Sequence, residues 1–347
     1  MRVLVTGHHG YVGSVLTPSL AAAGHEVSGL DTFYYRGCDF GPARVWHDER
    51  QRDIRDVTPR DFDGFDAVVH LAALSNDPVG DLSPTLTRDI NLEGSIAAAR
   101  AAKEAGVGRF IFASSCSMYG AAGPDDLLDE NAPLRPLTPY ADSKVRAEEA
   151  LFQLGDESFC VVSMRNATVY GTSPRLRLDV VLNNLAGWAT TTGSIRLLSD
   201  GQSWRPLVHV RDLARVTDLF LEAPAAVVGN QAFNVGSSEQ NYVVRELASV
   251  VSEISGCDVH FADGASPDPR SYRVDFSKLA REFPDLAFDW NAHRGARELV
   301  DEYRRVGLTS SVFESRRYVR LRQVRHLLDT GAVSGDLRWT PEPVPAG

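Results

Sequence analysis

The N-terminal stretch MRVLVTGHHGYVGSVLTPSLAAAGHEVSGLD, residues 1–31, decides the fold. It reads as a buried strand over residues 2–6, followed by a glycine-rich turn over residues 7–13. A helix over residues 14–23 then leads into a second strand that ends at Asp31. This order of strand, glycine turn, helix, strand and acid is typical of a unit that binds a dinucleotide.

The turn has the spacing G-x-x-G-x-x-G, and each glycine has a steric role. Gly7 permits the tight turn, Gly10 lets the backbone approach a pyrophosphate, and Gly13 lets the helix lie close to the strand. The helix N-terminus offers free N–H groups and a partial positive charge to the phosphates. Asp31 is placed to accept hydrogen bonds from a ribose 2′- and 3′-hydroxyl pair, and no arginine directly follows it. The stretch therefore favours NAD over NADP.

The composition limits the class of protein. The chain has 347 residues, 43% of them hydrophobic, which is enough for two lobes. Its net charge of −10 argues against nucleic acid and anionic membranes as partners. The four cysteines are scattered without metal-ligand spacing, so we predict no metal site and a reducing, cytoplasmic setting. No signal peptide or membrane-spanning run is visible, and the proline-rich end, residues 340–347, is expected to be a frayed tail.

Strand and helix patterns alternate through the first half of the chain. Further strands are expected over residues 65–73, 109–113 and 159–165, which predicts a doubly wound parallel sheet of the Rossmann type. The alternation stops near residue 171, and this predicts a smaller α/β C-terminal lobe for the substrate. We expect the NAD-binding domain to span residues 1–170, with return segments at about 205–236, and residues 171–347 to form mainly the substrate lobe with a helical extension.

Hydroxyl groups cluster where the strand over residues 109–113 ends, in the sequence SSCSMYG from Ser114. Ligands lie at the carboxyl ends of parallel strands, so these hydroxyls are expected to face the cofactor cleft. Tyr140 and Lys144 follow at i, i+4 spacing on one face of a predicted helix that ends at Leu154. The Lys144 ammonium is expected to lower the pKa of Tyr140 toward neutrality, which would make the phenol an acid/base group.

Two further long helices are expected, and the roles of several residues stay open. One long helix is expected from Ser83 to Ala105, and a second from Thr309 to Leu328. The second helix carries five arginines, and we interpret it as a solvated helix packed on the lobe or on a second subunit. The alternative is that the arginines form a basic rim around an anionic ligand. They are Arg316, Arg317, Arg320, Arg322 and Arg325. His8 and His9 are interpreted as loop residues with solvent-facing rings, although they could reach a pyrophosphate. Asp53 can accept a hydrogen bond from an adenine amino group or cap a helix.

With these residues in place, the chain resembles the extended short-chain dehydrogenase/reductase family, and within it the NAD-dependent nucleotide-sugar epimerases and dehydratases, such as UDP-galactose 4-epimerase-like enzymes. The resemblance rests on motifs that run in order through about residue 280. They are Thr6-Gly7 to Gly13, Asp53-Ile54, His70 to Ala73, Asn91-x-x-Gly94, Ser114-Ser115-x-x-x-Tyr119-Gly120, Tyr140-x-x-x-Lys144, Arg165 with Val169 to Gly171, Asp200-Gly201-x-x-x-Arg205, His209-Val210-x-Asp212 and Asp275-x-Ser277-Lys278.

The resemblance implies a site for NAD and a nucleotide-diphosphate sugar. It assigns Tyr140 as the catalytic acid/base, Lys144 to the nicotinamide ribose and Ser115 as the proton-sharing hydroxyl. The implied cofactor-binding residues are Gly7, Gly10, Tyr11, Val12, Gly13, Asp31, Asp53, Ile54, Leu71, Ala72, Ala73, Asn91, Ser114, Tyr140 and Lys144. The implied substrate-binding residues are Ser115, Ser117, Thr168, Asn183, Arg205 and Arg270, with Arg205 on the diphosphate. A homodimer through the two long helices, residues 83–105 and 140–154, is the family expectation.

One departure from the family pattern bears on the reaction. Dehydratases and uronate decarboxylases of this family carry a carboxylate just after the catalytic hydroxyl, whereas this chain has Cys116 and Ser117 there. The absence of that carboxylate favours an epimerase, with a dehydratase or a net oxidoreductase as the alternative and a non-catalytic NAD-sensing regulator as the least favoured one. Cys116 is either a further acid/base or a small buried packing residue, and packing is the favoured interpretation.

Overall fold

The computed structural model describes residues 1–41, 48–123, 126–266 and 268–340. Most of the predicted tail, residues 340–347, therefore lies outside the described residues. Seven parallel strands form the main sheet, in the order β11-β7-β5-β4-β1-β2-β3. They are β1 (Arg2–Thr6), β2 (Glu26–Asp31), β3 (Glu49–Gln51), β4 (Ala67–His70), β5 (Arg109–Ser115), β7 (Cys160–Asn166) and β11 (Gln231–Val235). This sheet confirms the predicted Rossmann-type α/β fold.

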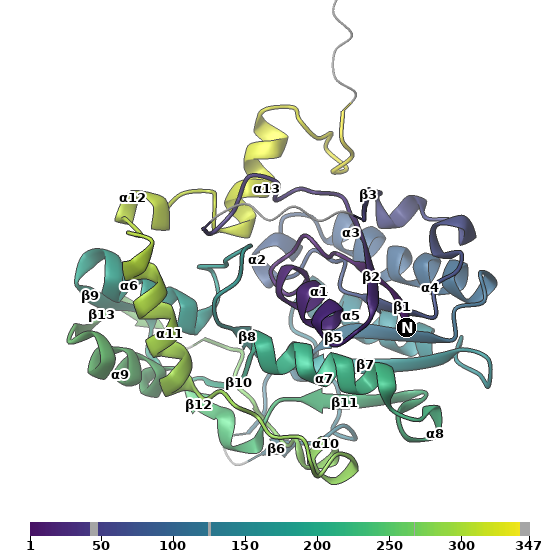
Figure 1. The fold of residues 1–347 in the computed structure, drawn as a ribbon. Helices are drawn as coiled ribbons and strands as arrows, with labels where there is room; N and C mark the ends of the chain where they lie inside the picture. The colour runs from purple at the N-terminus through teal and green to yellow at the C-terminus, as the bar shows by residue number, and fades with distance from the viewer. Residues whose placement is uncertain (42–47, 124–125, 267, 341–347) are drawn as a thin grey trace, which may run out of the picture.

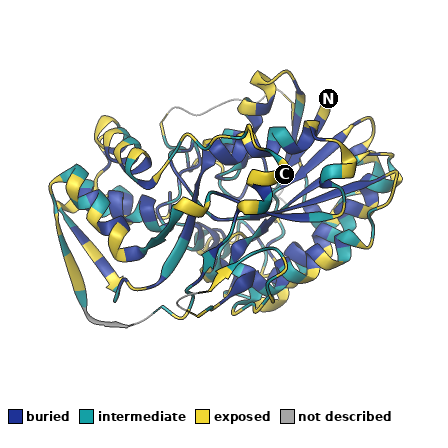
Figure 2. Cartoon of the chain, turned by 90° about the horizontal axis from the view of Figure 1, so that it is seen from below, coloured by how far each residue is buried: buried dark blue, intermediate teal, exposed yellow. Residues whose placement is uncertain are grey.

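The side chains of β1 show why the sheet is covered on both faces. Val3 and Val5 belong to the hydrophobic cluster on one face, and Leu4 between them belongs to the cluster on the other. Alternation over two apolar faces is the pattern of a parallel strand buried between two helical layers. The helices of the two layers enclose the sheet in Figure 1, and its strands are the dark blue interior of Figure 2.

Helices α1 (Gly13–Ala22) and α7 (Val210–Glu222) cover one face of the sheet, while α4 (Gly94–Glu104) and α5 (Pro139–Phe152) cover the other. The strand order reverses beside β1, which pairs with β2 on one side and β4 on the other. Such a reversal opens a crevice at the carboxyl ends of these strands.

The helix expected over residues 83–105 is interrupted. It consists of α3 (Pro84–Thr87), a π-helical turn η3 (Arg88–Glu93) and α4. The widened turn accompanies Asn91, whose Oδ1 accepts a hydrogen bond from Leu74 N at 2.8 Å. Inserted π turns of this kind are frequent at functional sites.

A second body is built around a separate hydrophobic cluster from the second half of the chain. Helices α6 (Val181–Thr192), α9 (Val244–Ser255) and α11 (Ala292–Arg305) share one hydrophobic cluster. Beside them lie a three-stranded sheet of β8 (Thr168–Tyr170), β10 (Trp204–His209) and β12 (Asn241–Val243), and a pair formed by β9 (Ser194–Ser199) and β13 (Asp258–Ser266). The smaller elements are α2 (Asp77–Gly80), α8 (Ala225–Val228), α10 (Ser277–Glu282), β6 (Leu127–Leu128), β14 (Arg273–Val274), η1 (Ile54–Asp56), η2 (Pro59–Phe62), η4 (Cys116–Tyr119) and η5 (Ser238–Gln240).

The single helix expected over residues 309–328 is wrong. The chain forms α12 (Ser310–Phe313) and α13 (Arg320–Asp329) instead, with a non-helical link between them. Phe313 packs in the cluster of α6, whereas Val324 and Leu327 pack in the cluster of the main sheet. A single straight helix could not place Phe313 in one cluster and Val324 and Leu327 in the other, so the chain bends between α12 and α13. In Figure 1, α13 lies near α2 and β2, at the edge of the main sheet.

No helix of the described residues is long and apolar enough to cross a membrane.

Candidate active site

A cavity of about 630 Å³ lies at the crevice beside β1. Its walls come from the glycine turn, the ends of β2, β4 and β5, the start of α5, residues 166–169 and 177–181, and the first residue of α13. This volume falls within the range of small-molecule and cofactor pockets, about 300–1,000 Å³. The predicted cofactor-binding residues line the cavity with the exception of Asn91.

The glycine turn leaves its backbone open toward the cavity. A β-carbon on Gly7, which has φ 76°, would lie 2.7 Å from Ala72 N, and one on Gly13 would lie 2.5 Å from the Gly7 oxygen. Neither position accepts a side chain without movement of the backbone. Gly10 lines the cavity, and its β-carbon would meet only the Gly7 oxygen, at 3.1 Å. The turn thus packs tightly against the residues that follow β4, while Gly10 stays bare, as a pyrophosphate site requires.

Asp31 ends β2 and lines the cavity. Its carboxylate accepts hydrogen bonds from Phe33 N at 2.7 Å and His9 N at 3.0 Å, which fix its orientation. Burial raises the pKa of this carboxyl. The buried group remains able to accept further bonds, because each carboxylate oxygen offers two lone pairs.

The expectation that His8 and His9 face solvent is wrong. They are 1% and 7% exposed, and neither lines the cavity. Both rings pack edge-on against Phe33, with centroids 5.6 and 4.8 Å away. His8 fits because Gly29 has no side chain: a β-carbon there would lie 2.4 Å from the imidazole. A histidine pair in a glycine turn gives no sign of this long-range packing.

Asp53 acts as a helix cap. Its Oδ1 accepts a hydrogen bond from Arg55 N at 2.9 Å, and its Oδ2 pairs with Arg55 Nη2 at 2.7 Å and with Arg338 Nη1 at 3.1 Å. The carboxylate also lines the cavity, so capping and a contact with the cofactor remain compatible, as predicted.

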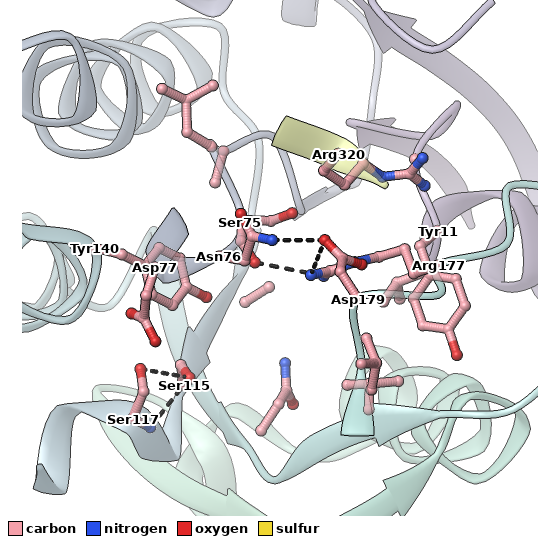
Figure 3. A pocket seen from close by; sticks show the side chains of 18 of the residues that line it. Tyr11, Ser75, Asn76, Asp77, Ser115, Ser117, Tyr140, Arg177, Asp179 and Arg320 are labelled. Carbon is pink, nitrogen blue, oxygen red and sulfur yellow. Dashed lines mark hydrogen bonds and ion pairs between the residues drawn. The ribbon is translucent and has the colours of Figure 1, made fainter. Parts of the chain in front are cut away.

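Ser115 and Tyr140 lie on one side of the cavity (Figure 3). Ser115 ends β5, and its Oγ donates to Ser117 Oγ at 2.9 Å and accepts from Ser117 N at 3.1 Å. Tyr140 lies in the first turn of α5, which Thr138 caps by accepting a hydrogen bond from Ala141 N at 3.2 Å. The strand end and the helix cap thus orient both hydroxyls toward the same space.

The electrostatics of the Tyr140–Lys144 pair differ from expectation. Burial raises the pKa of Tyr140 to about 12, and the Asp77 carboxylate adds to this shift. Burial lowers the pKa of Lys144 to about 7. Lys144 Nζ donates to the Ala113 oxygen at 2.7 Å and lies 5.9 Å from the centre of the Tyr140 ring. A lysine whose own pKa is lowered in this way cannot by itself lower the pKa of the Tyr140 phenol to about 7.

Three predicted site residues lie outside the cavity lining: Asn91, Asn183 and Cys116. Asn91 holds the loop after β4 through Leu74 N, and Asn183 Oδ1 accepts from Gly171 N at 3.0 Å, so both act as supports. Cys116 is 1% exposed, its Sγ donates to the Arg165 oxygen at 3.1 Å, and burial raises the pKa of the thiol. Its burial outside the cavity lining argues against the tentative acid/base role of Cys116 and favours the packing interpretation.

The predicted phosphate ligands Arg205 and Arg270 line the cavity together with Ser117 and Thr168. Both arginines are held by Asp268, which lies 2.7 Å from Arg205 Nη2 and 2.8 Å from Arg270 Nη2. Arg270 Nη1 also pairs with Asp77 at 2.5 Å.

Several polar residues of the site were missed in the sequence. Asp77 begins α2 beside Tyr140, and Asn76 Nδ2 donates to Asp179 Oδ2 at 2.7 Å across the cavity (Figure 3). Arg177 Nε in turn donates to Asp179 Oδ1 at 2.9 Å. The only signal for Asp77 was an Asn-Asp-Pro turn after a strand, which predicts a helix start and no chemistry. Arg320 also lines the cavity, which is the position that the basic-rim alternative requires, whereas Arg322 and Arg325 are exposed.

The chain belongs to the NAD-dependent epimerase/dehydratase family, whose model matches residues 3–236. Its similarity to individual members is moderate. It is 30% identical to a UDP-glucose 4-epimerase of Mycolicibacterium smegmatis over 298 residues, covering 81% of this chain and 92% of the relative. Its structure is similar to that of the Thermus thermophilus UDP-glucose 4-epimerase in complex with NAD, with a TM-score of 0.73 and 28% identity over 88% of this chain and 99% of the other.

A second structural relative carries out different chemistry. The dTDP-glucose 4,6-dehydratase of Streptomyces venezuelae, solved with NAD, has a TM-score of 0.77 and 26% identity over 90% of this chain and 100% of the other. These findings confirm the predicted family and NAD as the cofactor, and they match both the epimerase prediction and its dehydratase alternative. The bare Gly10 backbone and the cavity-facing Asp31 fit a dinucleotide with an unphosphorylated ribose.

Proposed function

We propose that the protein interconverts two UDP-sugars that differ in configuration at C4. The observation that carries the proposal is the shared cavity of Ser115, Tyr140 and the NAD-binding residues, with no carboxylate in the turn after Ser115. Two of the named relatives are UDP-glucose 4-epimerases. Residues 1–170, with return segments at about 205–236, would hold the cofactor, and residues 171–347 would supply most sugar-nucleotide contacts.

The chain supplies proton transfer and positioning. Bound NAD would supply the hydride chemistry, and its positively charged nicotinamide ring would favour the phenolate of Tyr140. Tyr140 Oη takes the proton of the C4 hydroxyl, with Ser115 Oγ beside it to share that proton, and later returns it. Lys144 Nζ is held at the floor of the site by the Ala113 oxygen. Arg205 and Arg270 face the diphosphate, and Asp268 holds both side chains in place.

The test is incubation of the purified protein with UDP-glucose in D2O, followed by NMR and mass spectrometry of the sugar. We expect UDP-galactose to form without net consumption of NAD and without deuterium on any carbon, because the same hydride returns to C4. Loss of water, with a mass lower by 18, or solvent deuterium on the sugar would contradict C4 epimerisation. Panels of dTDP-, GDP- and CDP-sugars then test the choice of nucleotide.

A dehydratase is the second candidate, and Asp77 is the observation that favours it. This carboxylate lies beside Tyr140, where an elimination could use a second acid/base. It already accepts from Thr138 Oγ1 at 2.7 Å and Arg270 Nη1 at 2.5 Å, which is why epimerisation remains the first choice. If elimination occurs, Asp77→Asn should abolish it, whereas epimerisation should survive the change with a smaller loss.

We further propose a cytoplasmic homodimer that pairs through α4 and α5. Both helices cover the same face of the main sheet, and Arg100 on α4 and Arg146 and Glu149 on α5 are exposed. Light scattering on the purified protein tests this: twice the chain mass of 37.9 kDa is expected, and a monomer would contradict it.

A further inference from the structure

Arg320 is a buried cation for which the described part of the chain provides no carboxylate within ion-pair distance. It is the first residue of α13, it is 3% exposed, and it lines the cavity. Its Nη2 donates to the Arg175 oxygen at 2.7 Å, and its guanidinium lies 4.0 Å from the centre of the Tyr35 ring. Burial lowers its pKa, yet a guanidinium keeps its proton at any physiological pH.

Each of the other arginines of the cavity has a carboxylate of the protein within ion-pair distance, and for Arg52 this is Asp61, 3.7 Å from its Nε. Arg177 pairs with Asp179 at 2.9 Å, and Arg205 and Arg270 pair with Asp268 at 2.7 and 2.8 Å. A buried charge without a partner costs several kcal/mol in folding, about 3–5 when a partner has been removed. An arginine in this position therefore indicates an anion that arrives with a ligand.

The position of Arg320 indicates which anionic group it would bind. In Figure 3 it lies on the side of the cavity that holds Tyr11 and Arg177, away from Tyr140 and Ser115. Tyr11 belongs to the glycine turn, whose backbone is open for a pyrophosphate. The pyrophosphate is also the only anionic group of NAD.

The C-terminal segment that carries Arg320, residues 318–340, is attached to the same part of the NAD-binding domain. Gln323 Nε2 donates to the Tyr34 oxygen at 2.9 Å, and the Tyr34 hydroxyl donates to the Leu337 oxygen at 2.5 Å. Trp339 Nε1 donates to the Thr32 oxygen at 2.6 Å. Arg338 pairs with Asp53 at 3.1 Å and also with Asp56. These bonds hold the segment over the residues that follow Asp31, at the ribose end of the predicted dinucleotide site.

We propose that Arg320 binds the pyrophosphate of NAD, and that residues 318–340 close over the bound cofactor so that it stays with the protein. The proposal rests on NAD as the cofactor and is independent of which sugar reacts. A failure of the UDP-glucose assay would leave it standing, and a failure of the tests below would leave the epimerase proposal standing.

The first test measures NAD retention in the full chain. Arg320→Met removes the charge at similar volume, Arg320→Lys keeps it, and Arg322→Met is the matched control because Arg322 is exposed on the same helix. NAD released by denaturation is quantified per chain, and its dissociation rate is measured by exchange with labelled NAD. We expect Arg320→Met to release NAD at least about ten-fold faster, Arg320→Lys to be intermediate and Arg322→Met to match the wild type. Equal dissociation rates for Arg320→Met and the wild type would overturn the proposal.

The second test separates a ligand role from a structural one. After NAD is stripped, Arg320→Met should unfold at the same urea concentration as the wild type or a higher one, because an unpaired buried charge has been removed. NAD should then raise the midpoint of the wild type more than that of the variant. A lower midpoint for stripped Arg320→Met with an unchanged NAD-induced shift would make Arg320 a structural residue and overturn the proposal.

The third test separates the two possible sources of pyrophosphate. ADP-ribose carries the pyrophosphate of NAD, and UDP carries that of a sugar nucleotide. Calorimetric titration of the stripped protein should show that Arg320→Met loses at least about ten-fold in affinity for ADP-ribose and keeps its affinity for UDP. The reverse pattern would assign Arg320 to the substrate and overturn the proposal.

Discussion

Lys144 and Arg320 line the same cavity as buried cations, one on each side of it. They are 2% and 3% exposed, and among the described residues neither has a carboxylate within ion-pair distance; each donates to a backbone oxygen instead. Lys144 lies in α5, close in sequence to the strand end that carries Ser115, whereas Arg320 lies 176 residues further along the chain. Both therefore carry the cost of an unpaired charge in a poorly solvated place.

The two side chains respond to that cost differently. Burial lowers the pKa of Lys144 to about 7, so this group can lose its charge near neutrality and suits a site where protons move. Arg320 keeps its charge and suits a site where a fixed anion binds. The comparison indicates that the side of the cavity near α5 is built for chemistry and the side near α13 for holding the cofactor.

The largest effect that would sharpen this comparison is expected from Tyr140→Phe. Without the phenolic hydroxyl, the site loses its acid/base group, and kcat should fall by about 10³-fold. NAD content after purification should stay at the wild-type level, which is the opposite pattern to Arg320→Met. Steady-state rates measure the fall in kcat, and cofactor analysis of the same preparations measures the NAD content. A variant that loses NAD along with activity would break the proposed division between the two sides.

Glu148→Gln should give the largest loss of stability. The Glu148 carboxylate lies 2.6 Å from Arg165 Nη2 in the core between α5 and β7, and it also accepts from Ser163 Oγ at 2.5 Å. Removing its charge leaves a buried arginine without a partner, which should cost about 3 kcal/mol in urea unfolding. Glu157→Gln is the control, because Glu157 is exposed and lies outside α4 and α5, and it should cost nothing measurable. If Glu148→Gln is as stable as the control, an unpaired buried arginine costs little free energy of unfolding in this protein. The inference that Arg320 needs an anionic ligand would then lose its energetic support.

The pH dependence of stability should reveal Lys144. Its folded pKa of about 7 lies below the ordinary value of 10.5, so between these values the unfolded chain binds the extra proton. Stability should therefore rise with pH in this window, by about 1 kcal/mol per unit from pH 7 to 9. Urea unfolding of wild type and Lys144→Met at several pH values measures the effect, and the variant should lack this rise. If the free energy of unfolding depends on pH in the same way in both proteins, Lys144 is not the group with the lowered pKa.

The smallest effect is expected at the end of the C-terminal segment. Trp339→Phe keeps most of the ring but removes the Nε1 bond to the Thr32 oxygen, worth about 1 kcal/mol. The loss should be visible in urea unfolding, and NAD should dissociate modestly faster. The exposed Arg325→Met serves as the control. Unchanged NAD exchange in Trp339→Phe would limit the cofactor role to Arg320 itself.

Sequence reasoning worked where local patterns and chemistry coincide. The glycine turn, Asp31 and the i, i+4 pair of Tyr140 and Lys144 all line the cavity as predicted, because short segments around strand ends position them. It failed for His8 and His9, whose burial depends on Phe33 and on the missing side chain at Gly29. It could only offer alternatives for Cys116, since its burial against the Arg165 oxygen comes from a neighbouring strand.

The sequence by itself determined the parallel sheet, the NAD site at its crevice, and the hydroxyl, tyrosine and lysine that meet there. These features follow from periodicity, glycine spacing and residues at the ends of consecutive strands. Only the tertiary structure decided the sign of the pKa shift at Tyr140, the presence of Asp77 beside it, and which of five C-terminal arginines reaches the cavity. Those outcomes depend on burial and on contacts such as that of Arg320 with Arg175, between segments whose separation along the chain leaves no local pattern.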